Sequence, residues 1–153
     1  MKTFLITMLF LTVFTNCSTN NAFSHFDINE NQAKSEDSLQ SAKIFNKEKS
    51  EGIISAIYLN SVLPHEYNDK EYFYVYLYVK NNSKSIDFFL NGEKAQEIQT
   101  LASQNRFSNL TSFKGDWQKY YLLVFDKQDK EILTLQVKIS QSASRKMVFQ
   151  KED

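Results

Sequence analysis

Hydrophobic and polar residues alternate one by one along residues 71–80, where the chain reads Glu-Tyr-Phe-Tyr-Val-Tyr-Leu-Tyr-Val-Lys. Successive side chains of a β-strand point to opposite faces, so this period of two predicts a strand. One face carries the apolar residues Phe73, Val75, Leu77 and Val79. The other face carries the tyrosines Tyr72, Tyr74, Tyr76 and Tyr78. We therefore expect a strand with an apolar inner face and an aromatic outer face.

Further segments between residues 53 and 150 have strand-like patterns. We expect strands over residues 53–59, 86–90, 93–99, 120–125, 132–139 and 146–150. The dipeptide Asn91-Gly92 lies between two of them, and it is the strongest short-range signal for a hairpin. A second hairpin is expected across the polar residues 126–130. In the strand after it, the residues expected to face the core are Leu133, Leu135, Val137 and Ile139.

This spacing of short strands predicts the fold class. About seven strands, without helices between most of them, favour an antiparallel arrangement over a parallel sheet. We expect a mainly β fold, an antiparallel immunoglobulin-like β-sandwich over residues 51–153, with a transthyretin-like sandwich or a small open barrel as the alternatives. The chain lacks the cysteine pair of antibody domains, so the expectation concerns architecture alone. Residues 100–118 show no clear pattern, and we expect a long connection there.

One short helix is expected before the strands, over residues 35–50. Ser35 is a suitable N-cap, and Gly52 lies just beyond the expected end. The apolar residues Leu39, Ala42 and Phe45 form a thin stripe at helical spacing. Such a helix would lie across the tyrosine face of strand 71–80. Alternatively, that strand is central and both of its faces are packed.

An apolar run opens the chain directly after Lys2. Residues 4–14 are mostly apolar, and a polar stretch follows them. The run is shorter than the roughly 20 apolar residues of a membrane-spanning helix. A basic residue followed by such a run is typical of a secretory signal peptide, which we expect over residues 1–16.

Cys17 follows this run and is the only cysteine of the chain. It cannot form a disulfide within the chain, and an unpaired thiol is unusual in an exported protein. The segment Phe14-Thr15-Asn16-Cys17 resembles the lipobox of bacterial lipoproteins. This resemblance implies cleavage before Cys17, acylation of its thiol and anchoring in the cell envelope. Ser18 in place of Asp is compatible with the outer membrane, facing the periplasm, which we expect; the inner membrane is the alternative. A soluble secreted protein and an uncleaved N-terminal anchor are the alternatives.

Residues 17–34 are polar and rich in asparagine, and we expect them to form a flexible, lipidated tether. The whole chain carries 18 Lys+Arg and 18 Asp+Glu, a formal net charge of +0. Such a balance supplies no basic surface for nucleic acid, so we expect no nucleic-acid partner. The expected contact with the lipid bilayer is therefore made by the acyl chains on Cys17.

Few residue patterns support catalysis. His25 falls in the expected tether and His65 in a loop-like stretch, and no second cysteine accompanies them, so no structural zinc site is expected. The chain has only 3 glycines and contains neither a Gly-rich phosphate loop nor a Gly-x-Ser-x-Gly turn. We expect no enzymatic activity, no cofactor and no metal.

The tyrosine row has more aromatic side chains than a solvent-facing strand needs. Tyrosine is enriched at protein interfaces because its ring is apolar and its hydroxyl polar. The candidate partner-binding residues are Tyr72, Tyr74, Tyr76, Tyr78 and Trp117.

Two classes of function follow. The favoured one is a membrane-anchored, non-catalytic binding or scaffolding module with an envelope protein as its partner; its architecture is similar to that of the lipoprotein of type VI secretion machines. The alternative is a small-ligand-binding or enzyme-like periplasmic domain, which needs a pocket between residues 60–70 and 100–118.

Overall fold

The computed structural model describes residues 30–80, 85–112 and 115–151. The expected signal peptide, Cys17 and His25 lie outside the described residues, as do residues 17–29 of the expected tether. Residues 30–34, the last part of that tether, are helical instead. Within the described ranges, no helix combines the length and the hydropathy needed to cross a membrane.

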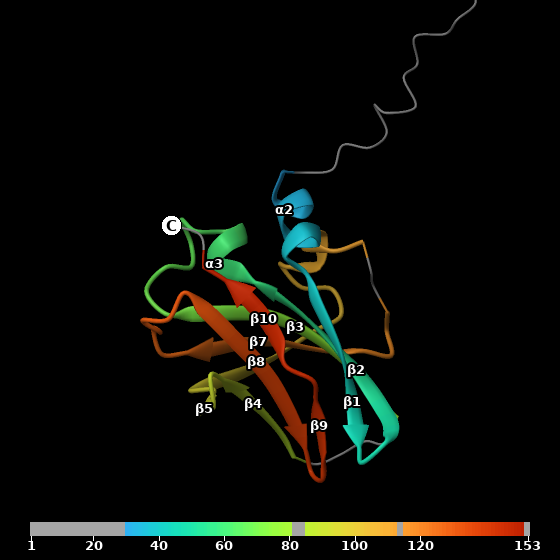
Figure 1. Ribbon diagram of the computed structural model, residues 1–153. Helices are drawn as coiled ribbons and strands as arrows, with labels where there is room; N and C mark the ends of the chain where they lie inside the picture. Colours follow the sequence, from blue (N-terminus) through green and yellow to red (C-terminus); the bar gives the residue numbers. More distant parts are fainter. Residues whose placement is uncertain (1–29, 81–84, 113–114, 152–153) are drawn as a thin grey trace, which may run out of the picture.

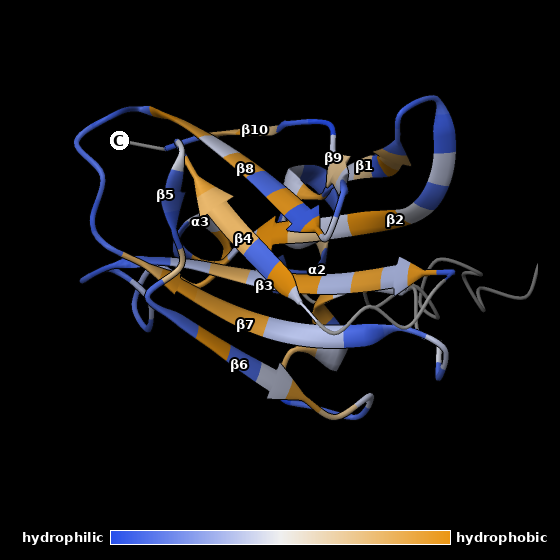
Figure 2. Ribbon diagram, turned by 90° about the horizontal axis from the view of Figure 1, so that it is seen from below, coloured by the Kyte–Doolittle hydropathy of each residue, from blue (hydrophilic) through white to orange (hydrophobic). Residues whose placement is uncertain are grey.

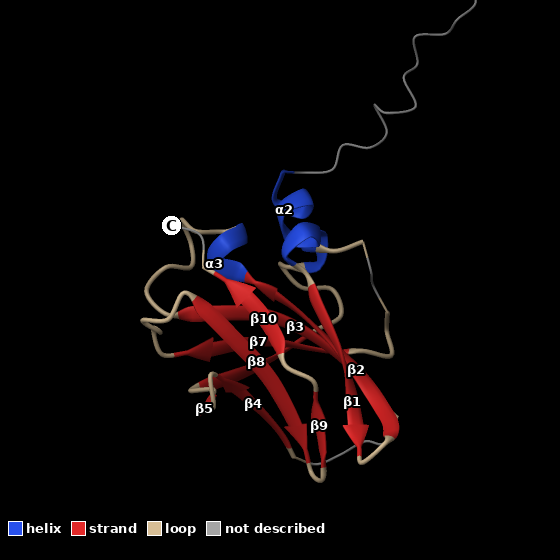
Figure 3. Cartoon of the chain, viewed as in Figure 1, coloured by secondary structure: helices blue, strands red, loops and turns tan. Residues whose placement is uncertain are grey.

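The described chain is built mainly of β-strands (Figures 1 and 3). Its helical segments are α2 (Glu30–Ser38), α3 (Leu59–Val62) and the 3-10 turn η3 (Ser108–Leu110). The first five strands are β1 (Gln40–Asn46), β2 (Lys49–Tyr58), β3 (Glu71–Val79), β4 (Ile86–Leu90) and β5 (Glu93–Lys94). The others are β6 (Glu97–Leu101), β7 (Lys119–Phe125), β8 (Ile132–Ile139), β9 (Ser142–Ser144) and β10 (Met147–Gln150).

All of these strands belong to one antiparallel, 10-stranded sheet that curls around its own interior. Its order is β5-β4-β8-β9-β1-β2-β3-β7-β6, and β10 pairs with β8. Figure 2 shows β4 and β8 on one side of the interior, with β3 and β7 on the other. The mainly β, antiparallel class is therefore confirmed. The structure has ten strands in one curled sheet rather than about seven in two sheets.

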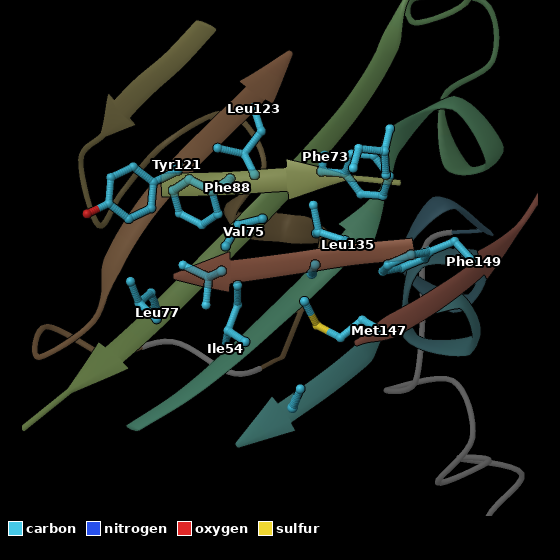
Figure 4. Close-up of a cluster of buried hydrophobic side chains, with 14 of the residues drawn as sticks. Ile54, Phe73, Val75, Leu77, Phe88, Tyr121, Leu123, Leu135, Met147 and Phe149 are labelled. Carbon is cyan, nitrogen blue, oxygen red and sulfur yellow. The ribbon is translucent and has the colours of Figure 1, made fainter. Parts of the chain in front are cut away.

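The interior of the curled sheet is the main hydrophobic core (Figure 4). The inner face of β3 meets the inner face of β8 there, as the alternating pattern predicted. Phe73 lies at one end of the core, with ring-centroid distances of 5.0 Å to Tyr58, 5.1 Å to Phe149 and 5.9 Å to Phe125. The core residues shared by these two strands are Phe73, Val75, Leu77, Leu133, Leu135, Val137 and Ile139.

The expected helix over residues 35–50 is wrong for most of its length. Helix α2 ends at Ser38, and the next residues form β1, which pairs antiparallel with β2. Ala42 and Ile44 alternate along β1, and both are buried in the main core. Helix propensity is a weak local preference, and the burial of these two side chains together with the β1–β2 hydrogen bonds outweighs it.

The expected hairpin between strands 120–125 and 132–139 is also wrong. Both strands exist, but β7 pairs with β3 and β6, whereas β8 pairs with β4, β9 and β10. The connection 126–131 crosses from one side of the interior to the other. Alternation indicates a strand, but it does not identify the neighbouring strand, because every strand offers the same backbone groups.

The expected hairpin at Asn91-Gly92 is confirmed. Both residues have positive φ angles, 52° and 95°, and they join β4 to β5. Such φ angles at both central positions are what a type I′ turn requires, and Asn-Gly adopts them at low cost. The strand expected over residues 93–99 is divided into β5 and β6. Ala95 and Gln96 lie between them and donate backbone hydrogen bonds to β4 and β7 respectively, at 3.0 and 2.9 Å.

A second hydrophobic cluster covers the outer face of β3. It includes Tyr74 and Tyr76 and is closed by α3, the loop after it and residues 102–112, which we call the polar loop. Helix α2 packs against α3 and η3 on the same side. Strand β3 is therefore central, with both faces packed, and no helix over residues 36–49 covers the tyrosines.

Candidate functional site

The tyrosine row does not form one accessible surface. Tyr74 is 1% exposed and Tyr76 is 4% exposed, whereas Tyr72 and Tyr78, near the ends of β3, are half-buried. The expectation that Tyr74 and Tyr76 contact a partner is therefore corrected, because the second hydrophobic cluster covers them.

Tyr74 acts as the centre of that cluster. Its ring lies 5.2 Å from Phe107 and is stacked 6.3 Å from Tyr120, measured between centroids. Burial raises the pKa of Tyr74 to about 12, with the Asn105 hydrogen bond opposing the shift, so its hydroxyl stays protonated at neutral pH.

Trp117 differs from the buried tyrosines because it is 57% exposed. Its ring meets Tyr78 edge-on at 5.1 Å, with an interplanar angle of 87°. A Cβ atom at Gly115 would lie 2.9 Å from the indole, so glycine permits this close approach. Tyr78 pairs with Ile53 of β2, which is 40% exposed. Ile53, Tyr78 and Trp117 thus form a small apolar surface, of which the sequence predicted two members.

The polar loop is fixed to the outer face of β3 by Asn105. The Nδ2 group of Asn105 donates to the carbonyl oxygen of Ala102 at 2.8 Å and to the Tyr74 hydroxyl at 3.3 Å. Its Oδ1 accepts a hydrogen bond from the backbone N–H of Phe107 at 2.9 Å. The backbone N–H of Asn105 donates to Ser108 Oγ at 2.8 Å. This one side chain therefore holds the loop in a single shape.

Tyr120 fixes the turn at Gly115, on the other side of the site from the polar loop. Its hydroxyl accepts the backbone N–H of Gly115 at 3.1 Å and lies 2.9 Å from two acceptors, the Gly115 carbonyl oxygen and Gln118 Oε1. Tyr120 is only 3% exposed. The turn at Gly115 is therefore tied to β7 from inside the fold.

A hollow of about 550 Å³ lies between these two fixed walls. Its volume falls within the roughly 300–1,000 Å³ of small-molecule sites. Most of the residues that line it carry polar side chains, and Tyr120 forms part of its wall. Other lining residues include Gln104, Asn105, Ser108, Asn109 and Asp116.

Three of the lining side chains are available to a ligand. Gln104, Asn109 and Asp116 are exposed, and in the part of the chain that the structure describes their side chains make no hydrogen bond or ion pair. Two amides offer both donors and acceptors, and the carboxylate accepts only. The hollow thus combines a rigid frame with unused polar groups.

A separate polar network is buried at the start of β3. Glu71 is fully buried, and its Oε1 accepts the Gln128 backbone N–H at 2.9 Å and the Lys151 ammonium at 2.6 Å. Its Oε2 accepts the Tyr58 hydroxyl at 2.5 Å. Burial opposes ionisation of Glu71, but these hydrogen bonds outweigh it and hold its pKa below the ordinary value. Burial and the nearby carboxylate raise the pKa of Tyr58.

This network joins residues from four separate parts of the chain. Lys151 also donates to the Gln128 carbonyl oxygen, so every member bonds to another member. A hollow of about 360 Å³ beside it is lined by Tyr58, Lys127 and Lys151. Lys127 donates to the Asn68 carbonyl oxygen at 2.6 Å. The ammonium groups of both lysines thus already donate hydrogen bonds to protein atoms.

In the part of the chain that the structure describes, none of the hollows named here lies between residues 60–70 and 100–118, where a pocket was expected. The two loops do meet, but they meet in direct contact: Arg106 lies over the Tyr67 ring, 5.5 Å from its centroid, and donates to its hydroxyl. His65 is exposed in the first loop. Among the described residues, no group of three or more His, Cys, Asp or Glu side chains could hold a metal ion.

Sequence reasoning missed the polar side chains around the hollow. Apart from Asp116, they lie in the run Ser103-Gln104-Asn105-Arg106-Phe107-Ser108-Asn109, where Phe107 is the only apolar residue. This cluster of amides and hydroxyls is the sequence signal for a polar binding site. It does not single out a site by itself, because polar runs are ordinary in loops. Its meaning depends on Asn105, whose hydrogen bonds are visible only in the fold.

Comparisons with known proteins leave the chain without an assigned family. No protein-family model matches it, and no curated protein matches it.

Proposed function

We propose that the protein is a lipid-anchored, non-catalytic binding module of the cell envelope and that its ligand contacts the hollow beside Trp117. The observation that carries this proposal is the contrast within the hollow. Asn105 and Tyr120 use their polar groups to fix its walls, whereas Gln104, Asn109 and Asp116 leave theirs to solvent.

A rigid frame with unused polar groups suits binding. Ordering a loop or a side chain on association costs about 0.5–1.5 kcal/mol for each immobilised side chain, and a loop that is already fixed avoids part of this cost. Function is also concentrated on loops that a stable scaffold positions. The polar loop fits this description because its apolar residues Phe107 and Leu110 are buried, at 2% and 7% exposure, and anchor it.

The hollow lies at the same end of the fold as the N-terminal attachment. Ser35 of α2 donates a hydrogen bond to the Leu110 carbonyl oxygen, so α2 rests on η3, which is part of the polar loop (Figure 1). A chain from an acylated Cys17 to Glu30 spans at most about 45 Å when fully extended. The start of α2 would then lie within about that distance of the bilayer surface.

Labelling and cross-linking in living cells test the two parts of the proposal. An alkyne fatty acid should label the wild type and not Cys17→Ala, which should also leave the membrane fraction. A photo-reactive amino acid at Asn109 should cross-link a discrete envelope component, whereas the same group at Lys130, in the β7–β8 connection, should not. Equal labelling of Cys17→Ala would overturn the anchor, and equal or absent cross-linking at both positions would overturn the binding site.

A further inference from the structure

We propose that the hollow and Trp117 together bind an uncharged oligosaccharide. This inference rests on the proposed function and names the chemical class of its ligand. One sugar unit would occupy the hollow, with its hydroxyls on Gln104, Asn109 and Asp116, and a neighbouring unit would lie against the indole of Trp117.

The hollow and Trp117 are close enough to act as one site. Trp117 contacts Tyr78, and Tyr120 of the hollow pairs with Tyr76. Tyr76 and Tyr78 are successive residues on the same face of β3, which places them roughly 7 Å apart along the strand. Gly115 lies between the two parts, since it lines the hollow and also approaches the indole.

The polar groups of the hollow match sugar hydroxyls. A hydroxyl is at once a donor and an acceptor, so it is satisfied by side chains that offer both roles within a small space. The amides of Gln104 and Asn109 offer both roles, and Asp116 adds a strong acceptor. Carbon-bound hydrogens on the face of a sugar ring are apolar, and the exposed indole of Trp117 gives them an apolar surface.

The charge of the site disfavours an anionic ligand. Asp116 is the only charged side chain among the described residues that line the hollow. A phosphate or a carboxylate would be repelled by it and would find no cation in the described lining. A single carboxylate among amides and hydroxyls is also a poor site for a divalent cation, which takes six or more oxygen ligands.

The position of the indole is fixed before any ligand arrives. The edge-on contact with Tyr78 orients the ring, and the absence of a side chain at Gly115 lets it lie near the backbone. Trp117 still keeps 57% of its surface exposed. An aromatic ring held in place and left accessible loses little conformational freedom when it binds.

Fluorescence of the full mature protein in detergent tests the inference directly. Trp117 is the only tryptophan of the chain, so its emission reports on this site alone. The probes are the tetramers of N-acetylglucosamine, glucose in β-1,4 linkage and glucose in α-1,4 linkage, with oligogalacturonate as the anionic comparison. We expect a saturable change with at least one neutral tetramer and none with oligogalacturonate.

Variants assign the binding to the residues named. Asp116→Asn and Asn109→Ala should each weaken binding of the neutral tetramer at least tenfold. Trp117→Ala should weaken it equally; calorimetry measures binding to this variant, because it lacks the tryptophan. Lys130→Ala is the matched surface control and should bind as the wild type does. Circular dichroism should be unchanged in all four variants, and the melting temperature should be unchanged in Asp116→Asn, Asn109→Ala and Lys130→Ala, because these three side chains are exposed.

Each outcome decides the inference. Tighter binding of oligogalacturonate than of every neutral tetramer, no saturable change with any probe, or unchanged affinity in folded Asp116→Asn and Trp117→Ala would each overturn it. If Asn109 cross-links a protein in cells while no sugar binds, the proposed binding module stands and the oligosaccharide does not.

Discussion

The ammonium group of Lys151 lies 2.6 Å from a carboxylate oxygen of Glu71, although the two residues are 80 positions apart in the chain. Glu71 begins β3 and Lys151 follows β10, so this ion pair ties the end of the described chain to an inner strand of the sheet. The Tyr58 hydroxyl and the Gln128 N–H complete the contacts of the carboxylate. The pair thus closes one end of the curled sheet.

Replacing Glu71 by alanine should destabilise the fold strongly. The change leaves the Lys151 ammonium without its counter-ion and leaves the Tyr58 hydroxyl and the Gln128 N–H without their acceptor. Removing one partner of a buried ion pair costs about 3–5 kcal/mol. Lys151 keeps 21% of its side-chain exposure, so we expect the lower end, about 3 kcal/mol, in urea-induced unfolding. Glu97→Ala, on the exposed strand β6, is the control and should change stability by less than about 0.5 kcal/mol.

The same carboxyl group should make stability depend on pH. Its pKa is lowered in the folded protein from an ordinary value of 4.5, so the unfolded chain takes up this proton first as the pH falls. The stabilisation from Glu71 is therefore complete above the unfolded pKa and is lost as the pH falls toward the folded pKa. Urea unfolding between about pH 6 and pH 3 should show a steeper loss for the wild type than for Glu71→Gln. Parallel curves for the two proteins would contradict this prediction.

Truncating Tyr74 should unfold or strongly destabilise the protein rather than remove a binding contact. Tyr74 is 1% exposed and packs against Phe107 and Tyr120. Replacing a buried aromatic residue by alanine costs about 3–5 kcal/mol. Tyr72→Ala, from the same row but half-buried, should cost about 1 kcal/mol. Equal losses in chemical denaturation would show that Tyr72 and Tyr74 are packed alike.

Gly52 should not tolerate a side chain. A Cβ atom at this position of β2 would lie 2.2 Å from the backbone carbonyl oxygen of Tyr78. Because a backbone atom cannot turn aside as a side chain does, Gly52→Ala should displace β2 from β3 and cost about 1–3 kcal/mol. Ser50→Ala on the same strand is the comparison and should be nearly neutral. Wild-type stability in Gly52→Ala would mean that the two strands separate at low cost.

Features that depend on neighbouring residues alone were predicted from the sequence. The alternation over residues 71–80 identified β3 and its inner face, since the period of two follows from strand geometry itself. The Asn91-Gly92 turn was equally local, because its positive φ angles are tolerated by those two residue types. The inner row of β8 was found by the same alternation.

Features that depend on residues far away in the sequence were not predicted from the sequence. The stripe formed by Leu39, Ala42 and Phe45 suited a helix, but pairing with β2 and burial of Ile44 made the segment a strand. The segment 126–130 suited a hairpin, but its Gln128 bonds to Glu71 as the chain crosses to the other side of the interior. Hydrogen bonds and burial between distant segments exceed such local preferences in free energy.

For the candidate site, the sequence alone determined which side chains were present, and the tertiary structure decided which of them a ligand can reach. Alternation could not show whether the outer face of β3 is covered, since that depends on the polar loop and α3, far away in the sequence. Covering it buried Tyr74 and Tyr76 and left Trp117 exposed. The same packing fixed the polar loop through Asn105 and so placed Gln104 and Asn109 opposite Asp116 around one hollow. Accessibility is a property of the folded surface, so no local pattern encodes it.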